Sequence, residues 1–142
     1  MLNTSHLHPI TVHFPIALLI SAFIFEVLVL IYKNNRVFNL VGFYLFIAGT
    51  LGAIVAVLSG NLFTEELSGP VGDVLENHHL YANITMYLAI LTSLFKVYLM
   101  VQKKEETSLK WISFSAMFIT MIAVGMTSYF GGSIVYDYLI KM

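Results

Sequence analysis

Four long apolar runs constrain the fold of this chain more than any other feature. They cover residues 10–32, 37–58, 80–101 and 109–130. A helix needs about 20 apolar residues to cross the hydrocarbon core of a bilayer, and in lipid only helices and closed barrels satisfy every backbone polar group. Barrel strands are alternating segments of about ten residues. The runs therefore predict an all-α, integral membrane four-helix bundle, with residues 1–142 forming a single domain.

Composition separates a membrane bundle from a soluble one. Hydrophobic residues make up 58% of the chain and charged residues 11%, whereas soluble domains have about half and about a quarter. The net charge of −1 indicates no nucleic-acid partner, and we expect the lipid bilayer instead. The absence of cysteine excludes disulfides, iron–sulfur clusters and the attachment of c-type haem. No basic region precedes the first run, so we expect a retained span rather than a signal peptide.

Basic residues predict the orientation of the bundle. The loops after the first and third runs, with their immediate flanks, hold Lys33, Arg36, Lys103, Lys104 and Lys110. Lys and Arg concentrate in cytoplasmic loops. We therefore expect an up-down-up-down bundle with both termini, and the loop over residues 64–77, outside the cytoplasm.

All five histidines lie at the starts of the first and third runs. They are His6, His8, His13, His78 and His79. In the expected topology both starts are outside, so the histidines share one leaflet. A single histidine at a membrane interface is ordinarily a capping or snorkelling residue, but a cluster of intramembrane polar residues is commonly functional. We expect His13 and His79 to be ligands, His8 and His78 to be further candidates, and His6 to be a flexible terminal residue.

Short loops favour a bundle in which sequential helices are neighbours, so the first and third helices lie diagonally opposite each other. With neighbouring axes about 8–10 Å apart, the diagonal is roughly 12–14 Å. That distance suits a metal ion or a flat cofactor between two inward-facing imidazoles. Asn83 is a second polar residue on the third run, one helical turn after His79.

Small residues recur at helical spacing along the second and fourth runs and just beyond their ends. They are Gly49, Ala53, Ala56 and Gly60, and then Ala116, Thr120, Ala123 and Thr127, followed by Gly131 and Gly132. Such stripes usually indicate close helix packing in a membrane. Alternatively, the small residues leave room for a cofactor, because Gly60 and Gly131 lie at the same end as the histidines. Pro15 predicts a local opening of the first helix beside His13.

Two charged residues lie inside apolar runs, Glu26 in the first and Lys96 in the third. Each is about six residues, or roughly 9 Å, from the cytoplasmic boundary. Because their helices are diagonal, we expect the two side chains to face the interior and interact there. No Ser-His-Asp order, phosphate loop or carboxylate pair lies near the histidines, so the sequence favours a carrier over an enzyme.

Four motifs resemble a known family. They are His-Pro-x-x-Val-His-Phe-Pro-Ile-Ala-Leu-Leu from His8 to Leu19, Ser59-Gly60, His-x-x-x-Asn from His79 to Asn83, and Gly-Gly-x-x-Val-Tyr from Gly131 to Tyr136. They are similar to motifs of the bacterial membrane family known as domain of unknown function twenty-two thirty-one. The resemblance implies a four-helix protein of the bacterial plasma (inner) membrane, associated with cytochrome modules and suspected of binding b-type haem. It points to His8, His13 and His79.

From these observations we hypothesise a b-type cytochrome that carries electrons, with His13 and His79 as axial ligands of haem iron. Two axial histidines favour electron transfer over oxygen chemistry. His8 lies five residues before His13, about 140° around a regular helix, so it either contacts a ligand residue without binding the iron itself or binds a second cofactor. The partners that this hypothesis implies are a periplasmic cytochrome c or a respiratory complex, and a second copy of the chain.

Two alternatives stay open. In the first, the chain binds a copper or zinc ion through nitrogens of His6, His8, His13 and the His78-His79 pair, since such ions take three or four of these ligands. In the second, the chain is a structural subunit of a respiratory assembly and its histidines only face the lipid boundary.

Overall fold

The computed structural model describes residues 7–33, 35–63 and 68–139. In this part of the chain the elements are α1 (Leu7–Ile31), α2 (Arg36–Phe63), α3 (Pro70–Val101), α4 (Leu109–Ser133) and a π-helical end, η2 (Ile134–Leu139). Four of the described helices are long and apolar enough to cross a membrane. The predicted all-α membrane fold is confirmed.

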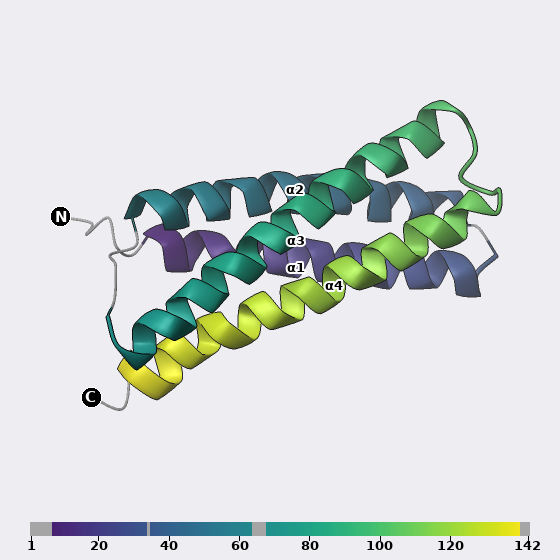
Figure 1. Cartoon of the computed structure of the whole chain (residues 1–142). Coiled ribbons are helices and arrows are strands. Elements are labelled where there is room, and N and C mark those ends of the chain that lie inside the picture. Colours follow the sequence, from purple (N-terminus) through teal and green to yellow (C-terminus); the bar gives the residue numbers. More distant parts are fainter. Residues whose placement is uncertain (1–6, 34, 64–67, 140–142) are drawn as a thin grey trace.

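The helices form two antiparallel pairs. Helix α1 packs along α2, and α3 packs along α4; α2 also contacts α3, and α4 contacts α1. In Figure 1 the pair α3/α4 is inclined to the pair α1/α2. Sequential helices are therefore neighbours, and α1 and α3 are diagonal, as predicted. The end of the bundle that contains His13, His78 and His79 is called the histidine end below, and the end that contains Lys33 and Lys103 the lysine end.

Helix α3 begins at Pro70, ten residues before the predicted start at residue 80, so that part of the prediction was wrong. Gly69 adopts φ +74°, and Pro70 follows in the first helical position, where its missing N–H is not needed. The turns from Pro70 to residue 79 are too polar to form part of an apolar run. Consequently His78 and His79 lie inside α3 rather than at its head.

The other helices differ from their predicted ranges by fewer residues. Helix α1 begins at Leu7 instead of residue 10, and α2 continues to Phe63 instead of residue 58. Helix α4 extends to Ser133 and runs on into η2, past the predicted end at residue 130. These ends lie beyond the continuous apolar runs, so the predicted ranges did not include them.

Glycines of α2 allow its backbone to approach α1 closely. A Cβ atom on Gly49 would lie 2.8 Å from Cγ of Leu19, and one on Gly52 would lie 3.2 Å from Cβ of the buried Pro15. A Cβ on Gly42 would lie 3.1 Å from Cβ of Phe25. Small residues at a membrane helix interface permit this kind of approach. At these three positions, of which Gly49 belongs to the predicted stripe, small residues serve the packing of α2 against α1.

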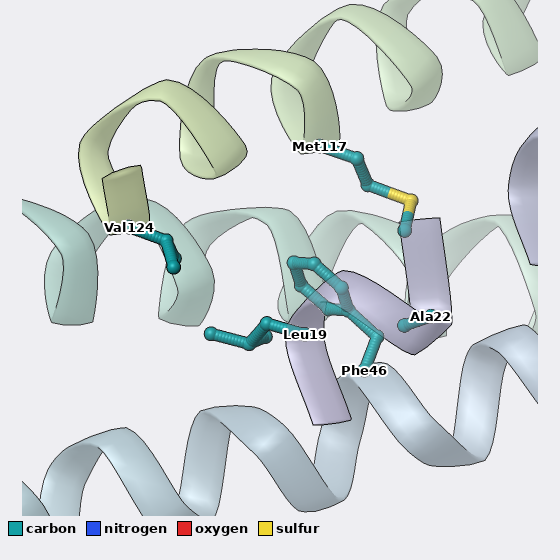
Figure 2. Packing of buried hydrophobic residues seen from close by; sticks show 5 residues of the cluster. All are labelled: Leu19, Ala22, Phe46, Met117 and Val124. Carbon is teal, nitrogen blue, oxygen red and sulfur yellow. The ribbon is translucent and has the colours of Figure 1, made fainter. Parts of the chain in front are cut away.

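An apolar cluster fills the middle of the bundle. Phe46 of α2 lies between Leu19 and Ala22 of α1 and Met117 and Val124 of α4, as Figure 2 shows. Dispersion contacts of this kind, rather than the hydrophobic effect, hold helices together in lipid. The cluster ties the α1/α2 pair to α4.

Hydroxyl groups also join neighbouring helices. The Thr50 and Ser93 hydroxyl oxygens lie 2.8 Å apart and join α2 to α3. Thr85 and Thr127 join α3 to α4 at 3.0 Å. Interhelical hydrogen bonds between such side chains each contribute roughly 0.6 kcal/mol in membrane proteins.

The predicted interaction between Glu26 and Lys96 is confirmed. Lys96 Nζ donates to Glu26 Oε2 over 2.7 Å, and the two side chains are 7% (Lys96) and 11% (Glu26) exposed. The pair connects the diagonal helices α1 and α3. It therefore lies within the bundle, not on its lipid-facing surface.

Candidate functional site

A small cavity lies between α2 and α3 at the histidine end. It measures about 10 Å³, which is enough for about one water molecule. The residues around it are Val57, Gly60, Asn61, His78, His79, Ala82 and Asn83. The structure thus places four of the predicted site residues, His78, His79, Asn83 and Gly60, around one space.

His79 presents an unsatisfied nitrogen. Among the described residues, its Nε2 atom is buried and has no hydrogen-bond partner. Leaving a buried polar atom unpaired costs about 1–3 kcal/mol, and such an atom in a native structure calls for an explanation. A neutral imidazole nitrogen is also the commonest metal ligand in proteins. The geometry therefore fits a group that takes an imidazole nitrogen from the protein.

His78 is held by the backbone of α4. Its Nδ1 atom lies 3.0 Å from the carbonyl oxygen of Thr127, and because a carbonyl only accepts, Nδ1–H is the donor. In the neutral ring the lone pair is then on Nε2. A hydrogen bond from the second ring nitrogen to a carbonyl is also how proteins orient metal-binding histidines.

Gly131 makes room for this histidine. A Cβ atom on Gly131 would lie 3.1 Å from Cε1 and 3.2 Å from Nδ1 of His78. Gly131, a predicted site residue, therefore allows α4 to approach the ring rather than lining the cavity itself. The rings of His78 and His79 have their centroids 6.1 Å apart.

Asn83 and Gly60 shape the cavity walls. The Asn83 side-chain amide donates to the backbone carbonyl of His79 over 2.8 Å, so this amide group is engaged within its own helix. Gly60 is buried where α2 faces the two histidines. Asn83 thus contacts the backbone of His79, whereas Gly60 lines the cavity without adding a side chain to it.

The histidine His13 does not lie at this cavity. The side chain of His13, on α1, is exposed and is not among the residues that line it. His8 lies in the first turn of α1, but its side chain is outside the described part of the chain, as is the whole of His6. Among the described residues no group of three or more His, Asp or Glu side chains is arranged to hold a metal ion.

Ser128 of α4 has a buried side-chain hydroxyl that the sequence did not indicate. Its Oγ atom is buried on α4 and has no hydrogen-bond partner among the described residues. Ser128 is four residues after the core residue Val124, so helical spacing places both on the same face. This spacing could have indicated that the Ser128 hydroxyl is buried, but only if Val124 had been known to be buried.

The fold and the site together define a four-span membrane protein with paired histidines in the interior of one end. A family model described as "predicted membrane protein (DUF2231)" matches residues 4–142. The chain belongs to this family, which confirms the resemblance seen in its motifs. No curated protein and no solved structure gives a significant match to the chain.

Proposed function

We propose that this membrane protein binds a b-type haem at the histidine end and carries electrons, with His79 as one axial ligand. The observation that supports the proposal most is the buried, unpaired Nε2 atom of His79. Haem iron takes imidazole ligands readily. His13 is the proposed second ligand, and His8 is a second candidate near it.

In this proposal the haem supplies one-electron redox chemistry, and the chain supplies ligands, burial and access. The Thr127 carbonyl and Gly131 fix the ring of His78 beside His79. The cavity itself is the size of a water molecule. Haem binding at His79 therefore requires α2 and α3 to separate at this end.

The size of the cavity favours a second candidate, a single copper or zinc ion. An ion of this kind takes imidazole nitrogens and needs no wide slot. His78 and His79 would supply two of its ligands, and further nitrogens would come from His13, His8 or His6. The described side chains alone do not complete such a set.

The absorption spectrum of the purified protein, recorded oxidised and reduced, separates the two candidates. We expect a Soret band with the sharp reduced bands of a low-spin b-type haem. A colourless sample with stoichiometric zinc, or one with copper and no Soret band, would favour the ion instead. A sample with neither haem nor metal would leave only a structural role in a larger assembly.

We also propose that the histidine end faces outward from a bacterial plasma membrane, where a periplasmic cytochrome c or a respiratory complex could exchange electrons with it. The basic residues of the two short loops lie at the opposite end of the bundle, which supports this orientation. A fluorescent protein that matures only in the cytoplasm, fused after Met142, should stay dark in membrane-inserted fusions. Bright fluorescence would reverse the orientation.

A further inference from the structure

A second cavity lies at the lysine end, next to the Glu26–Lys96 ion pair. It measures about 20 Å³, enough for one water molecule. All four helices contribute to it, through Glu26 of α1, Asn39 of α2, Lys96 of α3 and Ser113 of α4. It is distinct from the histidine-end site, and the inference drawn from it does not depend on haem.

Ser113 points to an occupant of this cavity. The residue is 2% exposed, and its Oγ atom has no hydrogen-bond partner among the described residues. Hydroxyls elsewhere in the bundle donate to the carbonyl four residues earlier, as Thr50 does to Phe46 and Thr120 to Ala116. Ser113 lines the cavity instead. A buried hydroxyl without a partner is destabilising, so a polar group in the cavity accounts for it.

The charges around the cavity select the kind of occupant. Glu26 is paired with Lys96, and Glu105 and Lys110 lie farther along the same lining. Two acidic and two basic side chains balance, so the site favours neither an anion nor a cation. The Lys96 ammonium has three N–H donors, and one of them is directed at Glu26. A small neutral molecule that both donates and accepts matches this lining, and water matches the volume.

We propose that a water molecule in this cavity bridges the Ser113 hydroxyl to the Glu26–Lys96 pair and lets the pair exchange protons with the aqueous phase at the lysine end. Glu105, in the segment between α3 and α4, and Lys110 extend the lining toward that phase. Ionisable residues inside a membrane commonly pair with one another and form proton relays. The pair is thus a hydrated proton-exchange site as well as a structural contact.

Water-edited solid-state NMR on the full chain in phosphatidylcholine and phosphatidylglycerol bilayers tests this proposal. With ¹⁵N-labelled lysine and ¹³C-methyl-labelled leucine, the Lys96 Nζ resonance is assigned by its loss in Lys96→Met. We expect magnetisation from water to reach Lys96 about as fast as it reaches the exposed Lys103. Ser113→Leu fills the cavity and should slow this transfer several-fold. Ser115→Leu, the same change on the exposed face of α4, should leave it unchanged.

Two results would overturn the proposal. The first is wild-type transfer to Lys96 as slow as transfer to the methyl groups of buried Leu19. The second is fast transfer that persists in Ser113→Leu. If the Leu variant does not insert, Ser113→Val adds less volume and replaces it. The wild-type comparison of Lys96 with Lys103 and Leu19 needs no variant in the cavity, so it decides the hydration of the pair in either case.

Discussion

Replacing Lys96 with Met should lower the free energy of unfolding by about 3–5 kcal/mol, because it leaves the Glu26 carboxylate without its partner inside the bundle. Glu26→Gln should also lower the free energy of unfolding, since the Lys96 ammonium then lacks an opposite charge beside it. The double variant Glu26→Gln/Lys96→Met removes both charges and should be destabilised by less than the sum of the two. The 2.7 Å contact between Lys96 and Glu26 is the basis for this coupling.

Reversible unfolding in mixed micelles of a mild detergent and dodecyl sulfate measures all four proteins of the cycle. Lys103→Met and Glu106→Gln form a matched control, because both residues are exposed at the lysine end. Exposed charges contribute little, so the control changes should be small and additive. Additive losses at Glu26 and Lys96 would instead mean that the two side chains snorkel independently toward water.

Replacing His13 with Ala should convert the proposed haem from low spin to high spin, because the iron loses one of its two imidazoles. Haem should still be retained through His79. Optical and electron paramagnetic resonance spectra of the oxidised protein measure the change, which should be complete rather than partial.

Asn77→Ala is the control for this substitution. Asn77 is exposed on α3 beside His78, and its side-chain amide donates to the carbonyl of Asp73 in the same helix. Its replacement should leave the spectrum unchanged. A normal low-spin spectrum in His13→Ala would remove His13 from the ligand set. His78, which lies at the cavity, would then be the next residue to replace.

The apolar runs predicted the four helices, because the bilayer requires continuous apolar length. The short loops predicted which helices lie next to each other. The apolar runs could not predict the first ten residues of α3. Those turns are polar, and their helical state depends on Gly69 and Pro70 at the start and on packing against other helices. The reach of α2 to Phe63 escaped prediction for a similar reason.

The candidate site at the histidine end and the ion pair at the lysine end were only partly predictable. The intramembrane charges identified Glu26 and Lys96, because an unpaired charge in lipid is costly. The sequence also indicated His79, but not that its Nε2 atom is buried without a partner or that Thr127 orients His78. Such facts depend on the rotation of each helix about its axis. Ser113 gave no signal because the sequence does not show how α4 is rotated. Its inward position can be inferred only once Met117, four residues later, is known to be buried.

The most direct measurement of the haem proposal is the haem content of the wild type and of His79→Ala, determined by pyridine extraction on proteins purified side by side. We expect b-type haem in a fixed ratio to the wild-type chain, and a large loss of it in His79→Ala. Asn77→Ala should retain the wild-type ratio. Wild-type protein without extractable haem, or His79→Ala with the full wild-type content, would contradict the proposed site.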